Sequence, residues 1–411
     1  MPGRNKRPSN GAEIRAGGVI WAAAAAICVS SILSTLPTPL YPIYEQTFHF
    51  SQIMLTVIYA VYVVGTVTAM FFFGRLSDQV GRRLVVLISL GIAAASALVF
   101  MFAQATWWLF PARILSGLGI ALVSGATTAW IVESEPGADK AAGTQIAIGA
   151  NFLGLATGPL MGGVLAQYAP SPLRLSYLMF VVLLFPLALV ICKTQETVRE
   201  ARSLDEASIA PRLGIPREMF GVFVPAAVGA FATFAVLGFY TALVPTLLEK
   251  ALQNKNHATA GGIVGELFVA GTIAIALTPR LPPHRGLLIA LIALLPSLGL
   301  LVAAEIARSM WILLIGTAVG GIATGLGCRC SLQKVNESVP EDKRSEVVSA
   351  YLIVCYAGIS LPVIGVALLA TATGPLIADA IFAAFIGLLA VLALIVEWKV
   401  GKSRTQNSNR R

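Results

Sequence analysis

The chain has 411 residues, of which 57% are hydrophobic and only 12% are charged. A soluble domain carries about 25% charged residues, so this composition excludes an ordinary soluble enzyme and indicates a protein that buries its apolar surface in a bilayer. The net charge of +9 is typical of the basic loops of a membrane protein, and we favour that interpretation over nucleic-acid binding.

Apolar segments recur along the whole chain, and a helix needs roughly 20 such residues to cross the hydrocarbon layer. The segments are continuously apolar rather than alternating, and every backbone polar group must be satisfied in lipid, so they predict helices and an all-α membrane protein. The twelve predicted spans cover residues 19–43, 51–73, 84–104, 107–132, 141–166, 173–193, 219–247, 259–278, 287–304, 310–331, 346–369 and 378–398.

The longest polar stretch, 194–218, separates six predicted spans from six. It predicts a cytoplasmic linker between an N-terminal bundle, 1–193, and a C-terminal bundle, 219–411. With the N-terminus inside, most of the 29 Lys and Arg residues fall on the cytoplasmic side. The loops of the other side hold only Arg174, Lys250, Lys255 and Arg308. This bias predicts that both termini lie in the cytoplasm.

The two halves carry similar short patterns. Residues 133–136 read Glu-Ser-Glu-Pro after the fourth span, and residues 337–340 read Glu-Ser-Val-Pro after the tenth. Pro159 and Gly162 of the fifth span likewise correspond to Pro362 and Gly365 of the eleventh. The shift is close to half of the chain, which predicts two six-helix bundles related by pseudo-two-fold symmetry, with a substrate site between them near the membrane midplane.

The loop after the second span, 74–83, reads Gly-Arg-Leu-Ser-Asp-Gln-Val-Gly-Arg-Arg. Its two glycines permit a tight turn between helices. Asp78 can face a helix N-terminus, where negative charge is stabilised, and Arg82 and Arg83 can pair with carboxylates or lipid phosphates. An ordinary basic loop is the plainer alternative.

This loop resembles the signature motif of the major facilitator superfamily at its main positions, and the resemblance extends to the span count, the linker and the repeat. The second copy, 279–286, departs from the pattern because Pro283 stands where Asp78 would. The resemblance implies a transporter that works by alternating access, with a gate on the cytoplasmic side.

Asp78 is expected to cap the start of the eleventh span near Ser345, as the resemblance implies, while Glu133 is expected to pair with one of the two arginines. Such contacts exist only when the inner side is closed, so they bias the two states of the transporter. The residues assigned to this gate are Asp78, Arg82, Arg83, Glu133 and Glu337.

The fifth span carries a second motif, formed by Gly154, Gly158, Pro159 and Gly162. Glycines four residues apart line one helix face, where another helix can approach closely, and Pro159 bends the helix. Generic small-residue packing is the plainer interpretation. The full pattern resembles the motif of the drug:proton antiporters of this superfamily, which implies export of small organic molecules. The glycine face is expected to meet Gly261 and Gly265 of the eighth span.

Two charged residues within spans are candidates for proton coupling, because charge inside a span is unfavourable without a function. Arg113 begins an Arg-x-x-x-Gly pattern that resembles another family motif, with snorkelling to the outer interface as the alternative. Glu266 is interpreted as the only acid well inside a span. Burial favours its neutral form, so it can load and release a proton, or it can stay protonated against a neighbouring helix. The first span lacks the acid that many such antiporters carry there, and Glu45 lies beyond its outer end.

The substrate cavity is expected to be mostly apolar, because the spans offer few charges. Candidates to line it are Tyr41, Tyr59, Tyr62, Asn151, Phe234, Tyr240, Tyr351 and Tyr356, with Trp130 as a further aromatic. Most residues of these types in a membrane protein are packing or interface residues, so we expect about a third of them to touch substrate.

We therefore predict a proton-coupled exporter of small apolar or cationic organic compounds in a bacterial inner membrane. Its expected partners are a small-molecule substrate, protons and lipid, and we expect a monomer without nucleic acid, cofactor or metal. The alternatives are an exporter of one metabolite, an uncoupled facilitator, and a receptor or lipid-handling protein on the same fold. An enzyme is not expected, because no nucleophile–base or metal constellation appears in the sequence.

Overall fold

The computed structural model describes residues 16–74, 76–134, 140–198, 214–216, 219–340 and 343–408. Within these ranges, 12 helices are long and apolar enough to cross a membrane. The predicted all-α membrane fold with twelve spans is therefore confirmed. Arg75 of the signature loop, Glu135 and Pro136 of the repeat, and most of the predicted linker lie outside the described residues.

Eight helices and two short 3-10 turns precede the linker. They are α1 (Ala16–Thr35), η1 (Thr38–Leu40), α2 (Tyr41–Phe48), α3 (Gln52–Phe73), α4 (Leu76–Val80), α5 (Arg82–Met101), η2 (Thr106–Trp108), α6 (Leu109–Ser134), α7 (Lys140–Tyr168) and α8 (Pro172–Cys192). The helices after the linker are α9 (Phe220–Ala242), α10 (Val244–Lys250), α11 (His257–Leu277), α12 (Pro283–Ala307), α13 (Met310–Ser338), α14 (Arg344–Thr373) and α15 (Pro375–Ser408).

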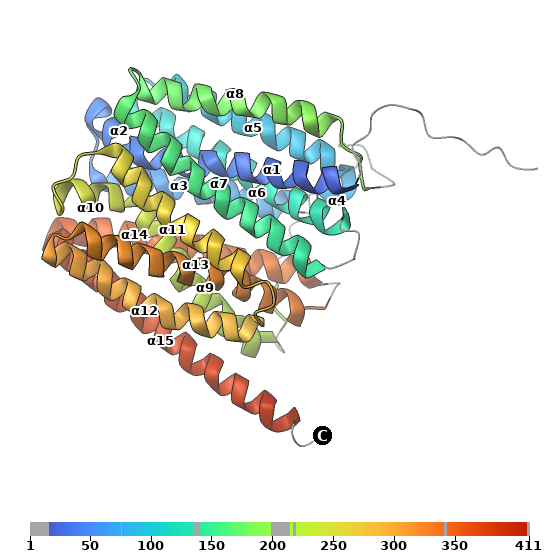
Figure 1. Ribbon diagram of the computed structural model, residues 1–411. Coiled ribbons are helices and arrows are strands. Elements are labelled where there is room, and N and C mark those ends of the chain that lie inside the picture. The colour runs from blue at the N-terminus through green and yellow to red at the C-terminus, as the bar shows by residue number, and fades with distance from the viewer. Residues whose placement is uncertain are drawn as a thin grey trace, which may run out of the picture.

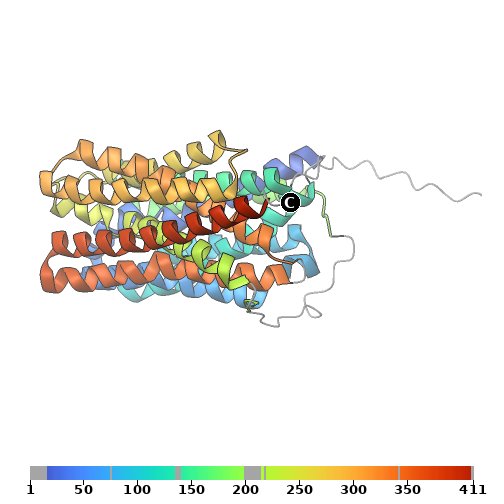
Figure 2. The same cartoon turned by 90° about the horizontal axis from the view of Figure 1, so that it is seen from below.

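The helices run along one common direction and form two bundles (Figures 1 and 2). The N-terminal helices, blue to green in Figure 1, lie above the C-terminal helices, yellow to red. We call the end where α1 begins the termini end, and the opposite end, which carries α2 and α10, the distal end. This arrangement agrees with the two predicted bundles, and their predicted boundaries, 1–193 and 219–411, stay a prediction.

The first and seventh spans are broken near their distal ends in the same way. Proline cannot donate a backbone hydrogen bond, so prolines interrupt a helix. Pro37 and Pro39 fall where α1 ends and η1 begins, and Pro42 opens α2. Pro245 likewise follows the end of α9 and opens α10. The break predicted for the first span is therefore present, whereas the break in the predicted span 219–247 was not anticipated.

The two halves meet closely at the distal end. The Tyr59 hydroxyl lies 2.6 Å from Oγ1 of Thr241. Lys250 Nζ donates to Gln52 Oε1 at 3.0 Å, and the His257 backbone N–H donates to Gln167 Oε1 at 3.0 Å.

The halves are joined by α3 with α14 and, more extensively, by the pair of α7 and α11. Toward the distal end the pair meets at Gly163 and Gly261, and Phe152 and Phe268 meet edge to face further along with ring centroids 5.8 Å apart. Toward the termini end Gln145 Nε2 donates to the Ile275 carbonyl at 2.8 Å. The structure therefore represents a state in which the distal end is closed.

Candidate functional site

Arg113 of α6 lies inside the N-terminal bundle, with 1% of its surface exposed. Its Nη1 donates to the Ser34 carbonyl at 3.0 Å, and its Nη2 donates to the Tyr41 hydroxyl. The guanidinium carbon also lies 5.3 Å, 5.5 Å and 5.9 Å from the ring centroids of Tyr41, Tyr59 and Tyr62. Aromatic faces attract a cation at these distances, which stabilises the buried charge. Arg113 therefore does not snorkel to the surface.

The tyrosines around Arg113 also reach the C-terminal half. Tyr59 contacts Thr241 of α9, and the ring of Tyr62 meets Tyr356 of α14 edge to face with centroids 6.2 Å apart. Within the described ranges no ion pair joins Arg113 to a carboxylate. Its charge is thus held by tyrosines that take part in the contact between the halves.

Glu266 lies on α11, the helix that packs against α7 of the other half. Its side chain is half-buried, and Oε2 is a buried oxygen that has no hydrogen-bond partner. The hydroxyl of Tyr240 interacts electrostatically with the Glu266 carboxylate. This hydroxyl accepts a hydrogen bond from Thr317 at 3.2 Å. Glu266 thus offers an oxygen free to hold a proton or a cationic group.

At the termini end, Arg82 connects the signature loop to the fourth span. Its guanidinium pairs with Asp78 of α4, donates to Ser77 Oγ at 2.7 Å, and pairs with Glu133 Oε1 of α6 at 2.7 Å. Only 6% of the Arg82 surface is exposed, whereas the side chains of Asp78 and Glu133 are 54% and 39% exposed, so solvent screens these pairs from the acid side. The expected contact between Glu133 and one of the arginines is therefore present, and it involves Arg82.

Glu196, two residues beyond Thr194 in the predicted linker, completes this cluster, and the sequence interpretation missed it. Its carboxylate accepts hydrogen bonds from the backbone N–H groups of Arg82 and Arg83, both at 2.9 Å. These donors are unpaired at the start of α5, where negative charge is favourable. Gly81 has a φ of 109°, and a β-carbon there would lie 2.6 Å from Glu196 Oε2. Glycine thus lets the carboxylate approach the helix end.

Other predicted gate contacts remain untested by the described residues. Asp78 pairs with Arg82, and the side chain of Asp78 is 54% exposed. The side chain of Ser345 lies outside the described residues. The expected cap of α14 by Asp78 therefore stays a prediction. Glu337 accepts a hydrogen bond from Gln333 of its own helix at 2.9 Å. Arg83 Nη1 donates to the Thr194 carbonyl at 3.2 Å.

The glycine face of α7 packs on a different helix from the one predicted. A β-carbon at Gly158 would lie 2.5 Å from the Ile32 carbonyl oxygen, and one at Gly162 would lie 2.5 Å from the Leu36 carbonyl oxygen. Gly154 likewise meets α1, so this face lies inside the N-terminal bundle. The predicted contact of these glycines with Gly261 and Gly265 was wrong.

The neighbouring positions of α7 make the contact with α11. A residue one position along a helix points about 100° away from its predecessor, so the residues that follow Gly158 and Gly162 face elsewhere. Pro159 and Gly163 meet Gly261, and Leu160 meets Gly265. The predicted approach of the fifth and eighth spans is thus present, but through an adjacent face of the helix.

Several of the residues proposed to line the cavity are packed inside one bundle. Asn151 Nδ2 donates to Ser31 Oγ at 2.9 Å, which ties α7 to α1. The buried hydroxyl of Tyr351 lies 2.6 Å from Ser331 Oγ, and Trp130 is fully buried. Phe234 and Tyr356 are half-buried and keep some exposed surface.

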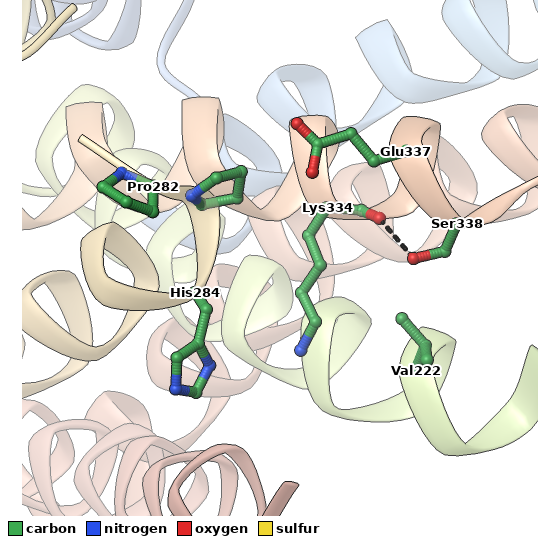
Figure 3. Close-up of a pocket in the computed structure, with 7 residues that line it drawn as sticks. Val222, Pro282, His284, Lys334, Glu337 and Ser338 are labelled. Carbon is green, nitrogen blue, oxygen red and sulfur yellow. Dashed lines mark hydrogen bonds between the residues drawn. The ribbon is translucent and has the colours of Figure 1, made fainter. Parts of the chain in front are cut away.

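A pocket of about 490 Å³ lies at the termini end of the C-terminal bundle (Figure 3). It is lined by Val222, Pro282, Pro283, His284, Lys334, Glu337 and Ser338. Lys334 pairs with the fully buried Glu397 of α15, and His284 Nδ1 lies 3.2 Å from the other oxygen of that carboxylate. These elements all belong to one half, so this pocket is not the predicted cavity between the halves.

A family model for the major facilitator superfamily matches residues 23–363, which is most of the chain. The protein belongs to the major facilitator superfamily. The twelve spans therefore belong to an integral multi-pass membrane protein of this family. The motifs at 74–83 and in the fourth and fifth spans fall within the matched region.

Three relatives illustrate the range of similar sequences. The chain is 34% identical over 128 residues to tetracycline resistance protein class B of Escherichia coli, covering 31% of each chain. It is 27% identical over 219 residues to the vesicular acetylcholine transporter of Rattus norvegicus, covering 51% of this chain and 40% of the other. It is 30% identical over 114 residues to methyl viologen resistance protein SmvA of Salmonella typhimurium, covering 27% of this chain and 22% of the other.

The chain therefore spans half or less of the length of each of these relatives. Two solved structures share its fold. The human organic anion transporter MFSD10 (TETRAN) gives a TM-score of 0.67 at 14% identity, covering 94% of this chain and 100% of that one. A bacterial homologue of the human lysosomal transporter Spinster, solved in an inward-facing and unoccupied conformation, gives a TM-score of 0.66 at 16% identity, covering 94% and 98%.

Proposed function

We propose that this transporter exports small apolar or cationic organic compounds in exchange for protons. The observation that carries the proposal is Glu266, a carboxyl group on an inter-half helix with a buried, unpartnered oxygen. Two relatives are named for resistance to tetracycline and to methyl viologen, and a third for transport of acetylcholine. Methyl viologen and acetylcholine are organic cations, which a carboxylate attracts.

Antiport follows if the proton and the substrate use Glu266 in turn. A carboxyl group surrounded by apolar side chains takes up a proton more readily than one in water, because burial disfavours the charged form. A cationic substrate that pairs with the ionised group releases the proton, and a new proton releases the substrate. Arg113 acts as a modulator in this scheme, because its fixed charge lies beside the tyrosines that join the halves.

In the proposed setting, the chain lies in a bacterial inner membrane with both termini in the cytoplasm. The basic loops favour this orientation, because the sequence assigns only Arg174, Lys250, Lys255 and Arg308 to the loops of the outer side. The closed distal end then faces outward. The cluster of Asp78, Arg82, Arg83 and Glu133, with Glu337 of the second half, then lies at the cytoplasmic gate.

The test compares Glu266→Gln with the wild type in proteoliposomes that carry an imposed pH gradient, with methyl viologen and tetracycline as probe substrates. Loss of gradient-driven transport with retained substrate exchange is the expected result. Glu249→Gln, which alters an acid of α10 outside the spans, is the matched control. Gradient-driven transport that survives in Glu266→Gln removes this residue from the coupling.

An uncoupler of the proton gradient separates the alternatives. Accumulation of the two probes is measured in a host that lacks its own exporters, with and without the uncoupler. An antiporter loses export when the gradient collapses. An uncoupled facilitator equilibrates the probes with or without the gradient, and an exporter of one metabolite transports neither probe.

A further inference from the structure

Helices α12 and α15 lie side by side at the edge of the C-terminal bundle and run in opposite directions (Figure 1). At the termini end, His284 of α12 contacts Glu397 of α15 at 3.2 Å. Near the middle, a β-carbon at Gly387 of α15 would lie 3.9 Å from side-chain carbons of Leu295 and Leu298 of α12. These contacts fix which faces of the two helices meet.

The same pairing brings two acids together at the distal end. Glu305 lies about six turns beyond His284 on α12, and Asp379 lies near the start of α15. The register set by the contacts of His284 with Glu397 and of Gly387 with Leu295 and Leu298 places these two acids opposite each other. Only 8% of the Glu305 surface and 6% of the Asp379 surface is exposed. The Glu305 oxygen Oε2 is buried and has no hydrogen-bond partner.

A hydrogen bond between two carboxyl groups requires a proton, because an ionised carboxylate can only accept. Two adjacent carboxylates in a buried site also repel each other strongly, so such a pair does not ionise fully at the same time. Because Glu305 and Asp379 are both buried and lie opposite each other, the pair is expected to hold at least one bound proton.

The surroundings offer no cation to replace that proton. The facing parts of the pair's own helices, 287–304 and 380–396, contain no charged residue or histidine. The distal parts of the other helices that pack on them also contain no charged residue or histidine; these parts are 310–320 of α13, 364–373 of α14 and 232–242 of α9. Tyr240 of α9 is the one titratable group in these three segments. Arg308 follows α12 but is exposed to solvent.

We propose that Glu305 and Asp379 form a proton-binding site that holds the distal ends of α12 and α15 together. The site is separate from Glu266, because both of its helices pack against α9, α13 or α14 of their own bundle rather than along the contact between α7 and α11. When the proton leaves, two carboxylates face each other in a buried contact and the helix pair is weakened. The pH on the distal side thereby sets the stability of this edge of the bundle.

The test is the pH dependence of thermal unfolding of the purified full-length protein in lipid nanodiscs. In the unfolded chain ordinary carboxyl groups lose their protons above about pH 5, whereas the folded pair keeps one. The folded state thus binds more protons, so stability falls as pH rises, by about tenfold in the unfolding equilibrium per pH unit for one proton. The wild type is expected to show a lower Tm at each step from about pH 6 to about pH 9.

Asp379→Asn is expected to lose most of this slope, because the amide donates a hydrogen bond to Glu305 without needing a bound proton. Glu305→Gln is expected to behave in the same way and carries the test if the first variant does not fold. Glu249→Gln is expected to keep the slope. Asp379→Asn is expected to remove its share of the slope in the Glu266→Gln background as well, so the result is independent of the proposed coupling at Glu266. Infrared absorption of protonated carboxyl groups is expected to decrease in Asp379→Asn.

Two results would overturn the proposal. The first is an unchanged Tm slope together with an unchanged carboxyl absorption in both variants, which would mean that the pair holds no proton. The second is a Tm that rises with sodium chloride but not with choline chloride and loses this response in Asp379→Asn. That result would show that a metal cation, rather than a proton, joins the two carboxylates.

Discussion

Gly261 is the position at which a single methyl group is expected to change the balance between the two states of the transporter. A β-carbon there would lie 3.0 Å from Gly163 Cα and even closer to the Pro159 carbonyl oxygen, both on the opposite half. Ordinary contacts begin at 3.4 Å, so α7 and α11 must move apart by at least a few tenths of an ångström. Both obstacles are backbone atoms, which cannot rotate away as a side chain does.

Overpacking of this kind costs about 1–3 kcal/mol. The cost applies only to the state in which the distal ends touch, so Gly261→Ala is expected to reduce the population of that state by about 5- to 150-fold relative to the open one. Transport is expected to slow, because each cycle must pass through the closed state.

The assay uses cysteines introduced at Gln52 and Lys250, whose side-chain ends meet at 3.0 Å across the closed distal end. Joining of the two thiols by a short bismaleimide cross-linker, which spans the length of the replaced side chains, reports closure, and Gly261→Ala is expected to slow it. The adjacent Gly262→Ala is the matched control, because a β-carbon there meets nothing within 4 Å. If Gly261→Ala cross-links and transports as fast as Gly262→Ala, the close approach of the two halves at this point is refuted.

Two further predictions concern the N-terminal half. Gly158→Leu is expected to destabilise the protein by about 1–3 kcal/mol, because the new side chain would be forced against α1. Gly149→Leu, on an open part of the same helix, is expected to leave the stability unchanged. Equal thermal stabilities of the two variants would contradict the packing. Asp78→Asn is expected to slow transport while leaving expression and substrate binding largely intact, because Arg82 keeps its 2.7 Å pair with Glu133; normal initial rates of uptake into inverted vesicles would count against a gate at Asp78.

The spans could be predicted from the sequence because a continuous apolar run of sufficient length has one stable solution in lipid. The predicted second span, 51–73, agrees closely with α3 (Gln52–Phe73). The helix ends were harder to predict, because helices continue beyond the apolar run. The predicted ninth span ended at residue 304, one residue before Glu305, although α12 extends to Ala307.

The acids near the ends of the spans were undercounted. Glu266 was interpreted as the only acid well inside a span, yet Glu305, Asp379 and Glu397 are also buried within helices that cross the membrane. Each lies near the end of an apolar run, where hydropathy does not distinguish an exposed acid from a buried one. Their partners come from other helices, and that pairing depends on how each helix is rotated about its axis.

The rotation of α7 caused the error in the glycine motif for the same reason. The sequence shows that Gly154, Gly158 and Gly162 share a face, and this is correct. It does not show which neighbour that face meets, because both α1 and α11 offer small residues or backbone to approach. The contact of Glu133 with Arg82 could be predicted, since the family motif fixes which surface both residues share.

The cap that Glu196 forms on α5 changes where the N-terminal half ends. Glu196 accepts hydrogen bonds from Arg82 and Arg83, and Thr197 donates to Glu133 Oε2 at 2.6 Å. The chain as far as Val198 thus belongs physically to the first bundle, although α8 ends at Cys192. If the two halves are produced as separate polypeptides, a break at the end of α8 leaves the cap on the wrong fragment. A break after Val198 gives a first fragment that keeps the Glu196 cap on its own signature loop.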